Sequence, residues 1–382
     1  MKKIGLVTLY HKNYNYGGII QAYAMQYIFQ QMNLDAKLIS FKTNRKHYLM
    51  NRFLNIGLRK SLELFTRKLL FRFLIRKEIN NLLLEKKKRY DIFMDHIPHT
   101  RLYTEESIVE SDEIFDFYVV GSDQVWNPGW WNDILLLNFT KKPKFSYAAS
   151  IGRGNLSNDE ACLLSKALSS YIDISVREKQ AQRIIKELCG VSSELVLDPT
   201  LLVEPFIWNE IAKRNELIDN YVLVYMVGNT NKYKKTIYNY CHDKGMKVVS
   251  IGYAKNMYFS SEEKYSDYII YDAGPLEWLG LIKYAKYVFT DSFHGSVFSI
   301  IFKRLFYCCE RDNPNDKTNE NSRLYSFLEL TGLEKRLLNA RSFQNDKLLD
   351  ENIDYEAVEN RLSIHRLKSK EFIKRNIDRM IK

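Results

Sequence analysis

The sequence predicts an α/β protein built from two Rossmann-like lobes that face a shared cleft. Short apolar runs rich in β-branched and aromatic residues alternate with amphipathic helical segments along most of the 382 residues. The alternation stops at the turn Val203-Glu204-Pro205 and then starts again, and a chain of this length is expected to form two domains. We therefore predict an N-terminal lobe over residues 1–203, a C-terminal lobe over 204–345 and a C-terminal helix over 346–382.

The first half begins with a strand–helix–strand pattern. Strands are predicted at 3–9 and 36–41, and the helix between them follows the segment NYNYGG. Gly17 and Gly18 at the start of this helix either let a ligand approach the backbone or only tighten the turn, and the sequence leaves both interpretations open. Neither GxGxxG nor GxxxxGK[ST] is present, so a dinucleotide site or P-loop is not predicted. Further strands are predicted at 117–121, 145–150, 172–176 and 195–197, with helices near 158–170 and up to Cys189.

A basic helical insertion is predicted at residues 45–98. Between Arg45 and Arg89 there are 14 Lys and Arg residues and three acidic residues, so this segment accounts for the whole net charge of +11. One interpretation is a helix that packs through one face and solvates its charges. The other interpretation, which we favour, is that residues 45–89 bind an anionic membrane surface. Nucleic acid is not a predicted partner, because the interleaved residues are mostly aliphatic and offer no stacking platform.

The composition limits the compartment and the cofactors. The five cysteines form no CxxC pair, so neither a disulfide framework nor a zinc site is predicted, and a reducing compartment fits best. There is no signal-peptide pattern and no run of about 18 apolar residues. We expect a cytoplasmic protein, peripheral at the inner membrane face if the basic insertion binds lipid, and no metal or cofactor.

Polar residues follow two of the predicted strands in the first half. The segment SDQVWNP contains hydrogen-bonding and stacking groups suited to a sugar, or it forms an Asx-type turn closed by Asn127-Pro128. Arg177 follows another strand, where it either points into the cleft or pairs with Glu178 or Asp173 at the surface. The residues predicted to bind an acceptor are Asn15, Gly17, Gly18, Asp123, Gln124, Trp126 and Asn127.

The second half contains the motif VFTDSFHGSVFS at residues 288–299, read as strand, tight loop and helix. A helix N-terminus after a strand suits a phosphate or carboxylate, and His294 there can exchange a proton near neutral pH. The alternative is a histidine that only makes a structural hydrogen bond. The other strands of the second half are predicted at 221–227, 247–251, 268–271 and 305–308, and its helices at 233–244 and 275–284. A long polar loop follows and carries Arg311, Lys317 and Arg323. Residues 354–382 are predicted to form one charged helix.

Six segments in this order carry a family resemblance: NYGGIIQAYAM, VVGSDQVWNP, SYAASIG, SVREKQAQRI, LDPTLL and TDSFHGSVFSI. Together they cover roughly residues 3 to 335, and the chain resembles the polysaccharide pyruvyl transferase family. The resemblance implies a GT-B-like architecture. It also implies transfer of a pyruvyl group from phosphoenolpyruvate (PEP) to a sugar or lipid-linked glycan, forming a ketal in an exopolysaccharide or other cell-envelope glycan.

The resemblance also implies roles for particular residues. His294 matches the family's proton donor or acceptor, and Arg177 matches an arginine that holds the PEP anion. The family often has an arginine two residues before the histidine, where this chain has Ser292. We expect Arg323, or else Arg311, to supply the missing charge. The predicted donor-binding set is Arg177, Ser292, Gly295, Ser296, Arg323 and Arg311.

Two alternatives to this function stay open. A sugar-nucleotide glycosyltransferase would use the same two-lobed fold, with Gly17-Gly18 and the His294 loop around a nucleotide diphosphate. A glycan- or lipid-binding protein without activity is supported only by the serine at position 292 and is opposed by the presence of His294 and Arg177.

Overall fold

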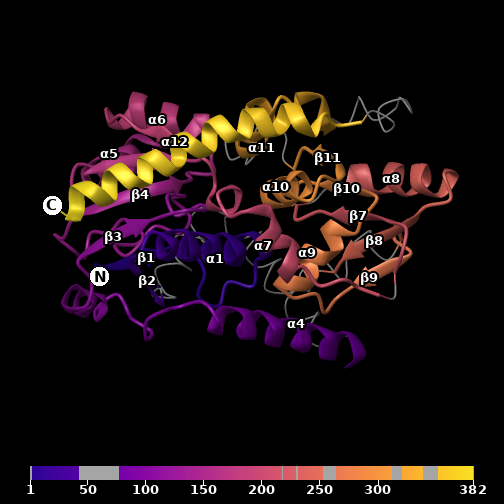
Figure 1. Ribbon diagram of the computed structural model, residues 1–382, viewed down its shortest axis with the longest axis horizontal. Coiled ribbons are helices and arrows are strands. Elements are labelled where there is room, and N and C mark those ends of the chain that lie inside the picture. Colours follow the sequence, from indigo (N-terminus) through magenta and orange to yellow (C-terminus); the bar gives the residue numbers. More distant parts are fainter. Residues whose placement is uncertain are drawn as a thin grey trace.

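The computed structural model contains two parallel six-stranded sheets that lie side by side (Figure 1). It describes residues 2–42, 77–216, 218–228, 231–252, 264–311, 321–338 and 352–381. The first sheet uses residues between Lys3 and Leu195, and the second uses residues between Tyr221 and Leu338. The predicted α/β class with two lobes is confirmed.

The N-terminal sheet has the strand order β2-β1-β3-β4-β5-β6, and its strand pairs are parallel. Strands β3 and β4 are buried along their whole length. This explains why β3 appears in the sequence as a continuous apolar run, whereas the buried Lys144 of β4 donates to the carbonyls of Leu137 and Thr140. The strands are β1 (Lys3–Val7), β2 (Asp35–Leu38), β3 (Phe117–Val120), β4 (Lys144–Ala149), β5 (Asp173–Val176) and β6 (Glu194–Leu195).

The C-terminal sheet has the strand order β12-β11-β10-β7-β8-β9, again with parallel pairs. Strand β10, which leads into the His294 motif, lies near the centre between β11 and β7. The strands are β7 (Tyr221–Tyr225), β8 (Lys247–Ile251), β9 (Tyr268–Ile270), β10 (Tyr287–Thr290), β11 (Leu305–Cys309) and β12 (Leu337–Leu338).

The helices pack on the sheets and connect successive strands. The structure confirms the helices predicted at 158–170, 233–244, 275–284 and 354–382 to within a few residues, whereas the helix Pro205–Ile211 is not predicted from the sequence. The helices of the described residues are α1 (Tyr16–Gln31), α4 (Lys77–Asp95), α5 (Asn158–Leu168), α6 (Lys179–Cys189), α7 (Pro205–Ile211), α8 (Asn231–Asp243), α9 (Pro275–Lys283), α10 (Phe293–Ile301), α11 (Ser322–Thr331) and α12 (Tyr355–Ile381), with short 3₁₀ turns η1 (Ile108–Glu113), η2 (Pro199–Leu201) and η3 (Glu334–Arg336).

Only part of the basic insertion belongs to the described residues. Its last section forms α4, which lies along one edge of the molecule below both lobes (Figure 1). Arg89 of α4 donates to the carbonyl of Asp272 (Nη1–O 3.0 Å) and pairs with its carboxylate (Nη2–Oδ2 3.1 Å). The predicted lipid-binding positions between residues 43 and 76 lie outside the described residues.

The two lobes share one buried apolar cluster, which includes Phe145 of β4 and Phe306 of β11. Tyr16 of α1 stacks on Trp278 of α9 with ring centroids 5.3 Å apart, and its hydroxyl donates to the carbonyl of Ala273 at 2.7 Å. These contacts join the start of α1 to the C-terminal lobe. They bring the carboxyl end of β1 opposite the C-terminal lobe.

The C-terminal helix α12 returns from the second lobe to the first (Figure 1). Near its start, the Tyr355 hydroxyl donates to the carbonyl of Arg304. Near its end, Arg375 pairs with Asp173 at the start of β5 (Nη2–Oδ2 2.9 Å), and Phe372 packs against Phe145. Among the described residues no helix has the length and apolar character needed to cross a membrane.

Candidate functional site

The N-termini of α1 and α10 meet at the junction of the lobes. Asn15 caps α1 by accepting from the Gly18 N–H (3.0 Å), and Ser292 caps α10 by accepting from the Gly295 N–H (3.3 Å). His294, in the first turn of α10, lies directly against Gly17: a Cβ atom built at position 17 would be 2.1 Å from His294 Nδ1. Gly17 is therefore required for this close approach between the lobes.

His294 is buried, with 6% of its surface exposed, and its Nε2 lies 3.5 Å from Asp198 Oδ2. This distance is longer than an ordinary hydrogen bond, and Nε2 has no hydrogen-bond partner within the described part of the chain. A buried imidazole with an unpartnered nitrogen beside a carboxylate is the arrangement expected of a general acid–base whose ring is oriented by an acid.

Asp198 is the centre of a buried polar network. Its Oδ2 accepts from the Ser122 hydroxyl (2.9 Å) and from Arg177 Nη1 (2.7 Å). Its Oδ1 accepts from the backbone N–H (3.1 Å) and the hydroxyl (2.7 Å) of Thr200. Burial raises the pKa of a carboxyl group, but His294 and Arg177 outweigh this effect, so the pKa of Asp198 lies below its usual range. Asp198 is therefore an anion beside His294.

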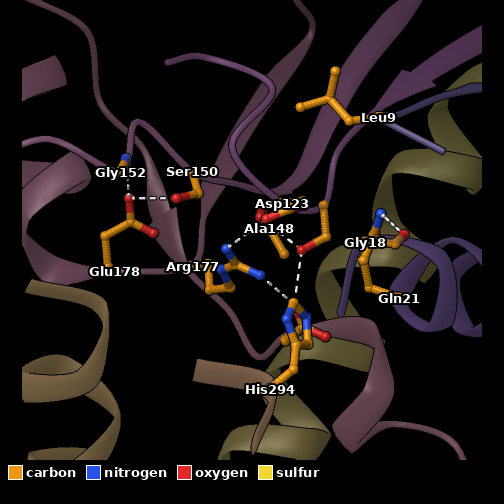
Figure 2. A network of polar contacts seen from close by, with 12 residues as sticks. Leu9, Gly18, Gln21, Asp123, Ala148, Ser150, Gly152, Arg177, Glu178 and His294 are labelled. Carbon is orange, nitrogen blue, oxygen red and sulfur yellow. Dashed lines mark hydrogen bonds and ion pairs between the residues drawn. The ribbon is translucent and has the colours of Figure 1, made fainter. Parts of the chain in front are cut away.

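Arg177 follows β5 and lies between two carboxylates. Nη1 binds Asp198, and Nη2 approaches Asp123 Oδ1 at 3.3 Å. Figure 2 shows the guanidinium pointing toward Asp123 and His294. Its Cζ also lies 4.4 Å from the centroid of the Phe293 ring. Burial opposes the charge, but the carboxylates prevail and raise the pKa of Arg177. The surface-pair interpretation of Arg177 is wrong, because its side chain is 1% exposed.

Glu178 points away from Arg177, toward the loop after β4 (Figure 2). Its Oε1 accepts from the Ser150 hydroxyl (2.9 Å) and the backbone N–H groups of Ile151 (3.0 Å) and Gly152 (3.3 Å). Asp173, the other proposed partner of Arg177, instead pairs with Arg375. Glu178 therefore stabilises the loop after β4, whereas Arg177 is part of the polar network around Asp198.

Two of the predicted acceptor residues have structural roles. Trp126 is fully buried in the N-terminal core, edge-on to Tyr171, and cannot stack on a sugar; that prediction is wrong. The reason is that Val125 and Trp126 turn back into the apolar cluster under the strand ends. Asn127 is buried and its Oδ1 accepts from the Gly129 N–H at 2.9 Å, which is the Asx-type turn.

The remaining acceptor candidates lie at or near the junction. Asp123 is partly buried, and its Oδ2 is 3.4 Å from a Cβ built on Gly18, so the two residues lie close together where β1 and β3 end, on the N-terminal side of the junction. Gln124 borders the same loop: a Cβ at Gly152 would lie 2.2 Å from its Nε2, which is buried and has no hydrogen-bond partner in the described residues. Asn15 uses its side-chain oxygen as the cap of α1.

The donor candidates on α10 are mostly occupied within the fold. The Ser296 hydroxyl is fully buried, donates to the Ser292 carbonyl (3.0 Å) and contacts Cys308 Sγ (3.0 Å). A Cβ at Gly295 would lie 2.5 Å from Thr290 Oγ1, so this glycine permits close packing on β10. By contrast, the backbone N–H groups of Phe293 and His294 donate no hydrogen bond to any described residue.

The two arginines proposed to replace the missing charge lie on different elements. Arg311 follows β11, donates through Nη2 to the Asp291 carbonyl (3.2 Å) and has Nε 3.5 Å from the Asp291 carboxylate. Arg323 is 9% exposed in the first turn of α11. Phe327, one turn later on the same face, packs edge-on to Phe293 at 5.4 Å. The buried face of α11 that carries Arg323 therefore adjoins the start of α10.

Sequence reasoning missed Asp198 as a site residue. Its signal was present: the segment LDPTLL places an aspartate directly after a predicted strand and before a proline, in one of the six family-like segments. An aspartate there is also the ordinary cap of a turn, and it does cap η2. Only the contact between the lobes shows that the other carboxylate oxygen faces His294.

Comparisons with known proteins agree with this architecture. The UDP-GlcNAc 2-epimerase of Methanocaldococcus jannaschii, solved in complex with UDP-GlcNAc and UDP, is 18% identical over 99% of each chain, with a TM-score of 0.53. The UDP-N-acetylglucosamine 2-epimerase of Rickettsia bellii is 13% identical over 99% of this chain and 96% of that chain, with a TM-score of 0.55. Such identities show the shared GT-B-type fold alone. A comparison with curated proteins finds no match.

The family comparison concerns the sequence itself. Residues 15–313 match the polysaccharide pyruvyl transferase family. The match includes both helix N-termini at the junction, Arg177, Asp198 and His294. The chain therefore belongs to the polysaccharide pyruvyl transferase family.

Proposed function

We propose that the protein transfers a pyruvyl group from PEP to two hydroxyls of a sugar in a polysaccharide or glycolipid precursor, forming a pyruvate ketal. The observation that carries this proposal is the buried His294, whose Nε2 lies 3.5 Å from the Asp198 carboxylate and has no hydrogen-bond partner among the described residues, where two helix N-termini meet. Family membership supports pyruvyl transfer to a glycan. The PEP donor and the ketal product are our proposal.

The chemistry requires a proton at carbon and a positive environment for two anionic groups. Protonation of the PEP methylene carbon makes C2 electrophilic, and one sugar hydroxyl attacks it and loses its proton. Phosphate then leaves, and a second hydroxyl closes the ketal while its proton leaves with the phosphate. His294 delivers and recovers the proton, and Asp198 orients its ring. No redox partner is needed.

The anion is proposed to bind at the start of α10. The backbone N–H groups of Phe293 and His294, which bind no acceptor within the described part of the chain, and the positive end of the helix dipole favour phosphate or carboxylate. Arg323 supplies the charge that Ser292 lacks. A direct contact between PEP and Arg177 requires Asp123 to release Nη2, whereas Nη1 stays with Asp198.

Calorimetry with PEP tests the donor. We expect PEP to bind the parent protein, and Arg323→Gln to weaken binding by about 10-fold or more, because a charge-assisted contact to an anion is lost. Arg183→Gln is the matched control, since Arg183 is 57% exposed on α6 and pairs only with Glu187 at 3.9 Å among the described residues. His294→Gln should keep PEP binding yet abolish pyruvyl transfer. Heat from a nucleotide sugar and none from PEP would favour the glycosyltransferase alternative.

Peripheral membrane attachment is a separate part of the proposal. It rests on the charge of residues 45–89, of which the structure describes only α4. We expect the parent to bind vesicles that contain anionic lipid, and the joint neutralisation of Arg67, Lys68, Arg72 and Arg76 to release it. Flotation of the two proteins with vesicles measures this. A parent that stays unbound at low salt would show that the basic segment is a solvated surface.

A further inference from the structure

The C-terminal helix α12 forms hydrogen bonds with the backbone of the segment that carries Asp198. Asp198 lies between β6 and η2, in a short stretch with little regular structure of its own. The backbone N–H of Leu197, immediately before it, donates to Ser369 Oγ of α12 at 2.9 Å. Ser369 is fully buried and donates in turn to the His365 carbonyl at 2.7 Å, so its hydroxyl both donates and accepts.

A second anchor from α12 holds the other side of the same segment. Arg366 Nε donates to the carbonyl of Leu201 at 2.8 Å. Residues 366 and 369 are three apart and so share one face of the helix. One turn of α12 therefore holds the backbone on both sides of Asp198.

The rest of the segment is held from within the N-terminal lobe and from α7. The Tyr147 hydroxyl of β4 donates to the Leu197 carbonyl at 2.8 Å, and Trp208 Nε1 donates to the Thr200 carbonyl at 3.1 Å. The anchors from α12 come from a helix whose two ends are fixed to different lobes. Its start is tied to Arg304 of the C-terminal lobe, and its end is tied to Asp173 of the N-terminal lobe.

We propose that α12 positions Asp198 through Ser369 and Arg366, and so sets the separation between the Asp198 carboxylate and His294 across the lobe junction. This inference rests on the proposed role of the His294–Asp198 pair. Ser369 and Arg366 are positioning residues, since neither contacts His294. Their importance follows from geometry: the Asp198–His294 separation is 3.5 Å, so a small shift of the segment makes or breaks a hydrogen bond.

Nuclear magnetic resonance of the full-length protein with isotope-labelled histidine tests the proposal. The chain has seven histidines, and His294→Gln assigns the resonance of His294. We expect Ser369→Ala to shift the ring nitrogen resonances of His294 by an amount comparable to Asp198→Asn, while His242 on α8 stays unchanged. Ser363→Ala is the matched control, because Ser363 is an exposed residue of α12 that donates to its own helix at 2.8 Å.

A double-mutant comparison separates positioning from general loosening. If Ser369 acts through Asp198, Ser369→Ala adds no further shift to His294 in the Asp198→Asn background. Should Asp198→Asn fail to fold, Arg366→Lys replaces it as the second test and is expected to shift His294 in the same direction as Ser369→Ala. An unchanged His294 in Ser369→Ala, or shifts that simply add, overturn the inference. Loss of PEP binding by the parent overturns the proposed function alone, because the histidine spectrum is read without substrate.

Discussion

At the scale of single residues, the site depends on the absence of a side chain at Gly17. Gly17 and His294 belong to different lobes, and the imidazole occupies the space that a Cβ at position 17 would need. Alanine is intrinsically favoured over glycine in a helix by roughly 0.5–1 kcal/mol. A loss of activity on Gly17→Ala would therefore reflect the contact with His294 and not the helix.

We expect Gly17→Ala to lower the rate of pyruvyl transfer by about 100-fold, since a displacement of a reacting group by about 1 Å costs on this order. The measurement is the turnover rate at a saturating concentration of PEP, the proposed donor. Gly245→Ala is the control, because its positive φ of 65° adds backbone strain while no atom lies within 4 Å of the new Cβ. The control should lose stability and keep its rate. A parent-like rate in Gly17→Ala would mean that His294 works from another position.

The contribution of an ion pair to the stability of this protein depends on how deeply the pair is buried, as the pairs of Arg177 and Arg183 illustrate. Arg177 and Asp198 are almost fully buried, so removing one partner would leave an uncompensated charge, at a cost of about 3–5 kcal/mol. The surface pair of Arg183 with Glu187, with more than half of each side chain exposed, contributes little. The buried network therefore holds the site in place as well as supplying its charge.

At the scale of elements, α4 attaches through a buried lysine. Lys86 is 8% exposed, and its Nζ lies 4.7 Å from the centroid of the Tyr16 ring. Burial lowers the pKa of Lys86 to about 8, and the opposing attraction of Asp272 is weaker. Because the unfolded chain binds this proton up to about pH 10, the folded protein gains stability as the pH rises from about 8 to 10.

Lys86→Met should remove this dependence. We expect the variant to be more stable than the parent at pH 7 by about 1–3 kcal/mol, and the difference to shrink as the pH approaches 10. Urea unfolding at pH 7, 8, 9 and 10 measures it. Lys88→Met, at a position 68% exposed on the same helix, should follow the parent at every pH. A constant difference between Lys86→Met and the parent would show that this lysine does not titrate in the range.

At the scale of the whole molecule, the two sheets are joined by a continuous core. The apolar cluster runs through both lobes, and α1, α4 and α12 each contact both of them. Two separately folding domains would instead be linked by few contacts. The lobes are therefore expected to unfold as one unit, although the chain is long enough for two domains.

Urea unfolding followed by tryptophan fluorescence and by far-ultraviolet circular dichroism should give coincident transitions. Tyr16→Phe removes the hydroxyl that donates to Ala273 across the lobes and should lower the midpoint of the whole transition, at a cost of about 1–3 kcal/mol. Tyr284→Phe, at a residue 37% exposed, is the control. Two separated transitions would contradict a shared cooperative core.

The sequence alone determined the fold class of this protein and most of its elements, although it did not indicate the short α7 and β12. Strands such as β3, β7 and β10 are short apolar runs, and helix α10 has a local signal in the serine cap before His294, because these preferences act between residues close in the chain. The same local patterns placed His294 and Arg177 at strand ends, where ligands of α/β proteins bind. The order of the segments was sufficient to identify the family resemblance.

Only the tertiary structure decided which of these residues meet. Ser369 binds the backbone of Leu197, the residue before Asp198, although 172 positions separate them in the chain. No local sequence pattern relates the two residues. Trp126 has the composition of a sugar-stacking residue, yet its neighbours in space make it part of the core. Burial, charge pairing and the contact of His294 with Gly17 depend on how two lobes pack, and packing is a property of the whole chain.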